Sequence, residues 1–463
     1  MNNLAKRISP LLAALLLVAC SAVPTLAPPH VDVPSSFKES DGTAWKVAQP
    51  AENQPRGEWW LAFKDPELTK LVNEAAQANQ NLAIAAARVK QARAIAGIAE
   101  ADRIPQVGVG VGAQRARVGT ATPPVTTYSA SLTASYEVDL FGRVGANVSA
   151  SQADAAASEA TYKSVLLALQ ADVAQTYFKL RATDAELDTL NRTVELRVQS
   201  VKVNQSRYDN GDIGEFDLAR AKTELSSARA EAIGLQRQRV QAEHALAVLL
   251  GKPAAMFTAQ ANPLVDTSLL PKIPAGLPSA LLERRPDITA AQRAMVASNA
   301  RIGVARSAMF PALTINANGG GAADTFSDVF KWSSRSWVLG ALMSMPLIDG
   351  GRNKANIARS EAVLEESVAT YRQNVLTAFA EVEDNLAGLR ILAGQTEQVD
   401  AAVVSARRSA DLAQKLYQAG RSSYLDLLDA QRNLASVERS AVQLRGNQAV
   451  TTVALVRSLG GAW

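Results

Sequence analysis

The feature that most constrains the fold is an internal duplication of the chain. The run RVGANV begins at Arg143, and the similar run RNKANI begins at Arg352, 209 residues later. At the same offset, YDNGDIGEFDLARAKTEL from Tyr208 parallels YQAGRSSYLDLLDAQRNL from Tyr417. A sequence that repeats itself at one spacing predicts two copies of the same set of elements.

Within each copy, apolar or aromatic residues recur every seven positions along a stretch without proline, with Thr396 as the only polar exception. We therefore expect helices over residues 143–208 and 352–417, each on the order of 100 Å long at about 1.5 Å per residue. The heptad period predicts a coiled-coil seam in the same register in both copies. The seam residues are Leu166, Val173, Leu180, Leu187, Val194, Val201 and Tyr208 in the first copy, and Val375, Val382, Leu389, Thr396, Val403, Ala410 and Tyr417 in the second.

A period of two residues precedes each long helix. In YSASLTASYEVDL, from Tyr128, the even positions are apolar or aromatic and the odd positions are Ser, Thr, Glu or Asp. This alternation predicts a strand with one apolar face and one polar face. QVGVGVGA, from Gln106, alternates between Val and Gly, and two more alternating runs lie in the second copy. The predicted strands cover residues 106–118, 127–140, 311–320 and 336–347.

The apolar strand faces favour a membrane environment. Tyr128 and Tyr136 are about 26 Å apart along an extended strand, close to the height of the aromatic-flanked band of a membrane barrel. Trp337 lies among the alternate apolar positions that form one face of the last predicted strand. One such strand would be typical of a soluble sheet, but four favour lipid. Since four strands cannot close a barrel and an open edge is not tolerated in hydrocarbon, several chains must pool their strands.

The N-terminus has the pattern of a lipoprotein signal. Lys6 and Arg7 precede an apolar stretch that is too short to span a bilayer and that ends in LVAC. This run resembles a bacterial lipobox, which implies cleavage before Cys20 and a diacylglycerol and an N-acyl chain on that residue. The alternative is an ordinary secretory signal with a chance cysteine. Ser21 follows the cysteine, and by the same resemblance this favours the outer membrane.

Composition argues against several function classes. The chain has 48 Lys and Arg against 44 Asp and Glu, and loss of the two basic leader residues brings it closer to neutrality, which does not support nucleic-acid binding. No later segment has the run of about 18 uncharged apolar residues that would predict a transmembrane helix. His30 and His244 are the only histidines and Cys20 the only cysteine. We therefore expect no metal site, no cofactor beyond the lipid, and no enzymatic activity.

Four blocks occur in order along nearly the whole chain. They are EWWLAFKDPELTKLVNEAAQANQNLAIAAARVKQA, LLERRPDITAAQRAMVASNARIGVARSAMFPALTI, MPLIDGGRNKANI and YQAGRSSYLDLLDAQRNL. They resemble blocks of the TolC-type outer-membrane efflux proteins, in particular the OprM-like (NodT-type) lipoprotein branch. The resemblance implies an α+β membrane protein. It would be a homotrimer with four strands per protomer in one twelve-stranded outer-membrane β-barrel, continued by a long α-helical coiled-coil barrel in the periplasm.

We expect five parts along the chain. These are a signal peptide (1–19), an N-terminal anchor and equatorial extension (20–60), a first repeat (61–251), an inter-repeat equatorial segment (252–286) and a second repeat (287–463). Each repeat holds a helix, two strands, the long helix and a shorter helix, the last over about 214–250 or 424–459. Six prolines in the segment between the repeats suit a connection that is not helical.

The resemblance also implies a function. It is that of the outer-membrane exit channel of a tripartite efflux pump, which passively conducts drugs and other small amphiphilic compounds. The partners would be a periplasmic membrane-fusion adaptor, an inner-membrane RND transporter and outer-membrane lipid. Two alternatives remain open: an outer-membrane channel for type I protein secretion, and a lipid-anchored coiled-coil scaffold of the cell envelope.

A gate is expected at the periplasmic helix tips. By the resemblance, Asp426 and Asp429 match carboxylates that form constricting rings, and Leu425 matches an apolar ring residue. A spacing of three places both carboxylates on one helix face, where rings of like charge would attract cations. The simpler interpretation is that acids in the first turns of a helix are favoured by its dipole.

Other tip residues support the same expectation. Tyr417 resembles an aromatic that links neighbouring coils, or is simply a core residue, and Arg421 lies one position before the basic residue of some members. The first copy has Asp217 and Arg220 in place of Asp426 and Asp429, which suggests that only the second hairpin lines the constriction. The tips near Gly211 and Gly420 would contact the adaptor.

Overall fold

The computed structural model describes residues 23–27, 29–39, 57–117, 123–267, 270–271, 273 and 284–461. Cys20, the expected signal peptide 1–19 and parts of the segments 20–60 and 252–286 lie outside these residues. The chain forms two compact units. The first comprises the described parts of 1–31, 87–161 and 287–374, and the second those of 32–86, 162–286 and 375–463.

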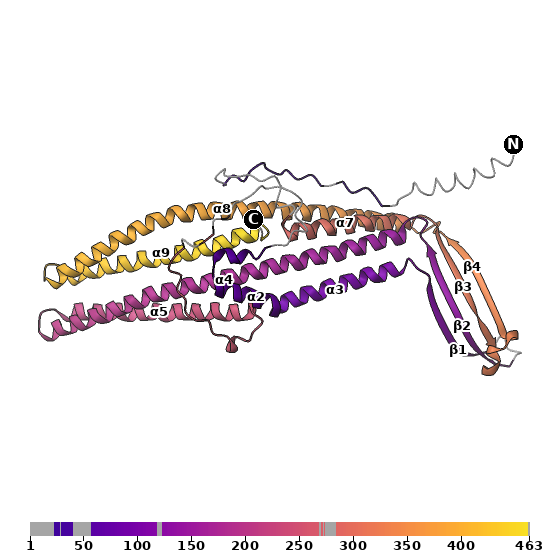
Figure 1. Cartoon of the computed structure of the whole chain (residues 1–463), viewed down its shortest axis with the longest axis horizontal. Helices are drawn as coiled ribbons and strands as arrows, with labels where there is room; N and C mark the ends of the chain where they lie inside the picture. Colours follow the sequence, from indigo (N-terminus) through magenta and orange to yellow (C-terminus); the bar gives the residue numbers. More distant parts are fainter. Residues whose placement is uncertain are drawn as a thin grey trace. The chain divides into compact units, whose positions relative to one another are not determined.

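Helices make up most of the described chain (Figure 1). The two longest, α4 and α8, have 67 residues each and begin 209 residues apart. The helix expected at the start of the first repeat is two helices, because Asn79 ends α2 and its side chain accepts the backbone N–H of Leu82 in the next. The bounds are η1 Trp59–Phe63, α2 Pro66–Ala78, α3 Gln80–Ala101, α4 Arg143–Asp209, α5 Glu215–Leu249, η2 Ala254–Met256, α7 Pro286–Ser307, α8 Arg352–Gln418 and α9 Tyr424–Ser458.

A carboxylate before each long helix defines where that helix begins. Asp139 accepts the backbone N–H groups of Val144 and Gly145 at 2.9 and 2.7 Å. Asp349 accepts two N–H groups at the start of α8, at 2.8 and 2.9 Å. These contacts satisfy N–H groups that have no partner within the helix, and they place negative charge at the positive end of the helix dipole. The two repeats therefore begin their long helices by the same device.

The heptad seam is packed along most of both long helices. Its buried members are Val173, Leu180, Leu187, Val375, Val382, Ala410 and Tyr417. Tyr208, at the end of α4, is 40% exposed, whereas its repeat equivalent Tyr417 is 7% exposed. The difference arises because Tyr417 packs against Tyr424 at 5.9 Å, while the residue equivalent to Tyr424 in the first copy is Glu215.

The four strands form one antiparallel sheet in the order β1-β2-β3-β4 (Figure 1). Their bounds are β1 Gln106–Ala116, β2 Val125–Val138, β3 Ala312–Ala323 and β4 Arg335–Ser344. In one cross-strand row Val109, Leu132, Gly319 and Trp337 lie side by side, and in a neighbouring row Gly108, Thr133, Asn318 and Val338 do so. The register therefore aligns the alternation of all four strands, giving one apolar face and one face rich in Gly, Ser, Thr and Asn.

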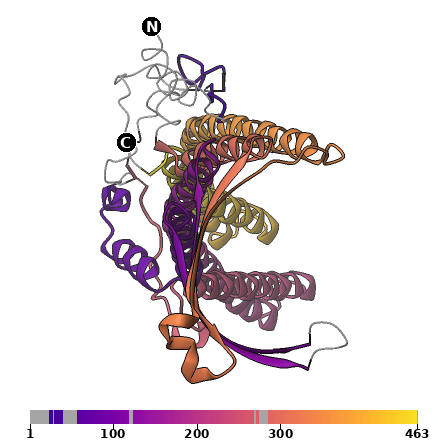
Figure 2. The same cartoon turned by 90° about the vertical axis from the view of Figure 1, so that its right-hand side faces the viewer.

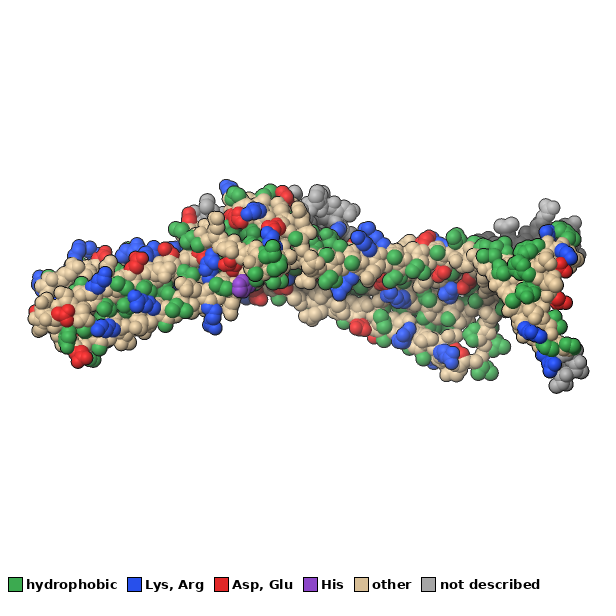
Figure 3. Space-filling view, turned by 90° about the horizontal axis from the view of Figure 1, so that it is seen from below, with side chains coloured by type: hydrophobic (Ala, Val, Ile, Leu, Met, Phe, Trp, Pro, Cys, Tyr) green, Lys and Arg blue, Asp and Glu red, His purple; other side chains and the backbone are tan. Residues whose placement is uncertain are grey.

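The larger core lies in the second unit. There Trp59, Trp60 and Phe63 of η1 pack with Tyr177 and Phe178 of α4, and the rings of Phe63 and Phe178 are 5.2 Å apart. Positive and negative side chains are interspersed along the helices on the face drawn in Figure 3. Among the described residues, no helix is both long enough and apolar enough to cross a membrane.

Candidate functional site

The first helical hairpin is α4 and α5, and the second is α8 and α9. Both hairpins have the same kind of turn between their two helices. Gly420 adopts a φ of +71°, its N–H donates to Tyr417 at 3.0 Å, and the N–H of Arg421 donates to Leu416 at 2.8 Å. Gly211 does the same after α4, with a φ of +81° and a 2.9 Å bond to the carbonyl of Tyr208. Glycine is favoured in this left-handed conformation because it has no side chain to clash. Both predicted tips are exposed in the described chain.

The three predicted gate residues lie on the exposed side of the first turns of α9. Leu425 is 41% exposed and the side chain of Asp429 is 63% exposed. Asp426 is also exposed. The neighbouring side chains Tyr424, Leu427 and Leu428 are buried and face the core of the tip. Leu425, Asp426 and Asp429 are therefore available for contacts outside the chain.

Asp426 also caps its own helix. One carboxylate oxygen accepts the hydroxyl of Ser423 at 2.7 Å and its backbone N–H at 3.0 Å, while the Ser423 hydroxyl oxygen accepts the N–H of Asp426 at 3.2 Å. The bonds from Ser423, first that of the side chain and then that of the backbone, lower the pKa of Asp426. This capping box accounts for an acid at position 426 by itself. Asp429 is different, because its contact is Arg432, one turn on, at 3.9 Å.

Tyr417 joins the two hairpins near the tip. Its hydroxyl donates to the side-chain oxygen of Asn204 on α4 at 2.9 Å, and both residues are buried. The guanidinium of Arg207 lies 5.1 Å from the centre of the Tyr417 ring. Arg421 is exposed. The arginine beside the tyrosine is thus Arg207 on the first hairpin, which the resemblance did not indicate.

Arginines on α9 form further contacts with the first hairpin. Arg432 pairs with Glu224 of α5, with a Nε to Oε2 distance of 3.1 Å. Arg439, one heptad further on, contacts Glu186 of α4 and lies 3.4 Å from Glu231 of α5. Arginine on one helix and glutamate on the other recur at the same seven-residue spacing, so these pairs fix the register of the two hairpins.

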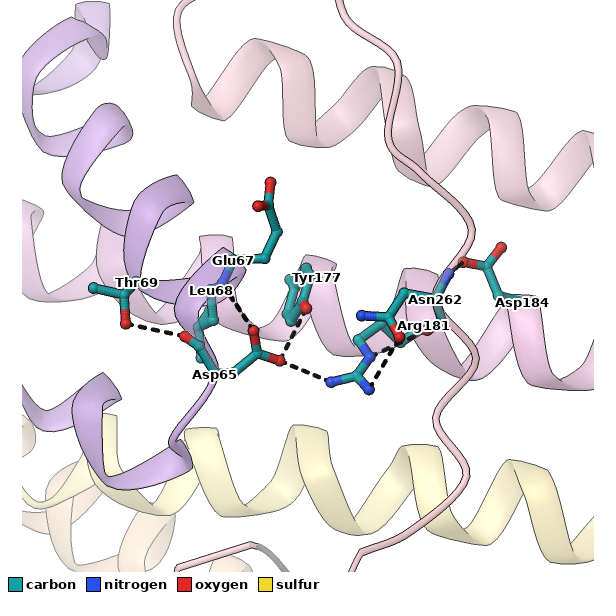
Figure 4. A network of polar contacts seen from close by, with 8 residues as sticks. All are labelled: Asp65, Glu67, Leu68, Thr69, Tyr177, Arg181, Asp184 and Asn262. Carbon is teal, nitrogen blue, oxygen red and sulfur yellow. Dashed lines mark hydrogen bonds and ion pairs between the residues drawn. The ribbon is translucent and has the colours of Figure 1, made fainter.

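A second polar network holds the first residues of the repeat on α4 (Figure 4). One oxygen of Asp65 accepts the N–H groups of Glu67 and Leu68, both at 3.1 Å, and so caps α2. The other oxygen accepts the Tyr177 hydroxyl at 2.9 Å and the Arg181 guanidinium at 2.8 Å. Burial, followed by the charge of Asp65, raises the pKa of Tyr177, so its hydroxyl stays protonated and donates. The FKDPEL run is thus a helix start and an anchor at once.

The same network binds the segment after the first repeat. Arg181 donates to the backbone carbonyl of Asn262 at 3.1 Å, and Asp184 accepts the Asn262 N–H at 2.9 Å. Arg239 of α5 pairs with Asp184 at 2.6 Å and donates to the carbonyl of Ala259 at 2.9 Å. Charged side chains thereby satisfy the backbone of a segment without regular structure. No local sequence pattern marks these residues, so their role was not predicted.

The aromatic residues expected in a membrane band lie on the apolar face of the sheet. Tyr128 and Tyr136 of β2 face Ala323 and Ile315, and Trp337 of β4 is 80% exposed. Large aliphatic side chains on this face are also exposed, including Val109 at 80%, Leu132 at 57% and Leu339 at 66%. A contiguous exposed apolar face of this kind marks an interaction surface or a membrane contact.

The family model of the outer membrane efflux proteins matches residues 71–252 and 277–461. The chain belongs to the outer membrane efflux protein family. It is 32% identical over 458 residues to the cation efflux system protein CusC of Escherichia coli, covering 99% of each chain. It is 33% identical to the toluene efflux pump outer membrane protein TtgI of Pseudomonas putida, covering 98% of each.

A solved structure shares the fold of this outer membrane efflux protein. The open state of the outer membrane channel MtrE of Neisseria gonorrhoeae superimposes with a TM-score of 0.83 at 28% identity, covering 95% of this chain and 98% of that one. The resemblance inferred from sequence is confirmed, as are the outer-membrane location and the role as the outer-membrane component of an efflux system.

Proposed function

We propose that this outer membrane efflux protein acts as a homotrimeric exit duct. Three chains would pool their strands in one twelve-stranded barrel, and their long helices would form a periplasmic tube. Small amphiphilic compounds would pass through it without an energy source of its own. An inner-membrane RND transporter and a periplasmic adaptor would deliver them.

The observation that carries this proposal is the open four-stranded sheet with one apolar face. Among the strands of the described residues, β1 and β4 each pair with one neighbour, so each presents a row of backbone N–H and C=O groups at its free edge. In hydrocarbon every such group needs a partner, which only another chain's edge can supply. The Gly-, Ser- and Asn-rich opposite face suits a water-filled lumen.

The tip of the second hairpin supports a gate at Leu425, Asp426 and Asp429. These side chains are exposed on one side of α9. The Tyr417–Asn204 bond holds α8 against the first hairpin, and the arginine–glutamate pairs hold α9 against it. Three-fold symmetry would bring three copies of each carboxylate together at the axis. Repulsion among them would favour cation binding, and loosening the links to the first hairpin would let the tips move apart.

Two further contacts belong to this proposal. The exposed turns at Gly211 and Gly420 would meet the adaptor. Lipid on Cys20 would tether the chain to the outer membrane, in addition to the strands.

Cross-linking between the free strand edges tests the assembly. One cysteine is placed on β1, at Val109, and a second is moved along β4 from Val338 to Leu342, in the full-length lipidated protein. Oxidation should yield covalent dimers and trimers and no larger species, because a closed ring of three ends the series. A matched control places the pair at Leu132 and Gly319, which face each other within one chain, and it should cross-link without a change in mass. Monomers only at every β4 position, or an open ladder of polymers, would refute the closed trimer.

A further inference from the structure

The loop between β3 and β4 folds back onto one face of the sheet. It contains η3 (Phe326–Phe330) and η4 (Trp332–Ser334). The rings of Phe326 and Tyr128 are 6.1 Å apart, and a Cβ added at Gly321 would lie 2.0 Å from the carbonyl oxygen of Val329. By the strand register, Tyr128 and Gly321 both belong to the apolar face. The loop therefore covers that face, at the end of the sheet opposite the start of α4 (Figure 2).

This loop exposes aromatic rings next to cations. Phe326, Phe330 and Trp332 are 57%, 62% and 81% exposed, while Val329 is 3% exposed and anchors the loop. The guanidinium of Arg335 lies 4.5 Å from the centre of the Trp332 ring. Lys331 is exposed beside it, 2.7 Å from Asp328. We call these five residues the aromatic–cation surface: Phe326, Phe330, Lys331, Trp332 and Arg335.

The chemistry of this surface suits the headgroup layer of a bilayer. The headgroup layer borders hydrocarbon on one side and water on the other. Aromatic rings can contact the apolar side while neighbouring cations remain on the polar side. Within hydrocarbon the two cations would be costly, and in water the three rings would remain unburied. Phosphate groups of anionic lipids would provide an anionic partner for Arg335, whereas Lys331 is already paired with Asp328 and adds positive charge beside it. Trp337, two residues beyond Arg335 on the same face, continues the apolar surface toward the hydrocarbon.

A neighbouring copy of the chain is a poorer occupant. The loop lies over the two central strands, since its contacts are to Tyr128 of β2 and Gly321 of β3. A second copy would pair along the free edges, β1 and β4. We infer that the aromatic–cation surface binds phosphate-bearing anionic lipid headgroups in the outer leaflet. This inference rests on the proposed function, because the apolar face must lie in a bilayer.

Lipid titration of the purified, full-length trimer tests the inference. Phosphatidylglycerol is added to trimers in a zwitterionic detergent, and bound lipid is counted by native mass spectrometry. Phosphatidylcholine, which has a phosphate but no net charge, and inorganic phosphate, which has no acyl chain, form the comparison arms. We expect Arg335→Gln to weaken phosphatidylglycerol binding about fivefold, the factor that corresponds to about 1 kcal/mol for one basic residue near an anionic surface. Arg408→Gln, an exposed arginine on α8, should leave it unchanged.

The binding results distinguish a lipid site on the aromatic–cation surface from a protein interface and from no site. Weaker phosphatidylglycerol binding by Arg335→Gln, with phosphatidylcholine binding unchanged and no competition from inorganic phosphate, supports a lipid site. Equal binding by wild type, Arg335→Gln and Arg408→Gln overturns it. Loss of the trimer in Trp332→Ala with binding unchanged in Arg335→Gln would assign the loop to a protein interface instead. If wild-type protein forms no trimers, the proposed function itself fails; if trimers form and Arg335→Gln has no effect, only this inference fails.

Discussion

Replacing Tyr417 by phenylalanine tests the link between the two helical hairpins. The change removes the hydroxyl that donates to Asn204 at 2.9 Å and leaves the rest of the buried ring in place. Asn204 is 1% exposed, so water cannot easily replace the lost donor. A buried acceptor without a partner costs about 1–3 kcal/mol. We expect the free energy of local opening at the tip to fall by about 1–2 kcal/mol, which raises the open population by a factor of about 5–30.

Hydrogen exchange measured by mass spectrometry in lipid nanodiscs reports this opening directly. Peptides from the last turns of α4 and α8 should exchange about 5–30 times faster in Tyr417→Phe than in wild type. The matched control is Tyr208→Phe at the equivalent position of the first repeat, where the ring is 40% exposed. That variant should change the opening free energy by no more than about 0.5 kcal/mol.

The double variant Tyr417→Phe with Asn204→Leu sharpens the test. Because it removes donor and acceptor together, it should recover part of the loss caused by Tyr417→Phe alone. Equal exchange in Tyr417→Phe, Tyr208→Phe and wild type would refute the role assigned to this hydrogen bond.

Three further perturbations follow from the geometry. Asp65→Ala removes the cap of α2 and the ion pair with Arg181, and should destabilise that helix start by about 2–3 kcal/mol. The loss should appear as faster trypsin cleavage at Lys64. Unchanged cleavage would contradict the stabilising role of the Asp65 network. The lowered pKa of Asp426 means that its contribution to stability is present at neutral pH and is lost as the pH falls through that pKa. Asp426→Asn should therefore flatten the acid dependence of hydrogen exchange in the first turn of α9, after correction for intrinsic rates, and an unaltered dependence would count against the capping box. Gly446→Ala places a Cβ 2.5 Å from the Cβ of Ala182 on α4. Overpacking should destabilise the protein by about 1–3 kcal/mol and so lower its melting temperature, whereas Gly394→Ala, in open space, should not lower it. Equal melting temperatures of Gly446→Ala and wild type would show that the helices can separate freely there.

Sequence periodicity predicts the parts of the fold that depend on local repetition. Alternation from Tyr128 onward correctly indicates one apolar strand face, because a strand's side chains alternate whatever surrounds it. The heptads likewise predict packed helices of the observed length. The seam does not extend to Tyr208, since the packing of a heptad residue depends on its partner and Glu215 stands where the second repeat has Tyr424.

Contacts between different elements of the fold could not be predicted in this way. The fold-back of the loop onto Gly321 depends on the absence of a side chain at one position and on Val329 eight residues later. Arg207 lies beside Tyr417 although 210 positions separate them. At the predicted gate, sequence places the carboxylates Asp426 and Asp429 on one helix, but only the structure distinguishes the capped acid from the one beside Arg432.

Single-channel conductance in a planar bilayer tests the central claim most directly. The wild-type mature protein is compared with the double variant Asp426→Ala, Asp429→Ala, with trimer content measured for both. A gated duct predicts small currents in the wild type and larger currents, less blocked by multivalent cations, in the variant. The absence of conductance from well-folded, inserted trimers of both proteins would contradict the claim that the chain forms an open path across the outer membrane.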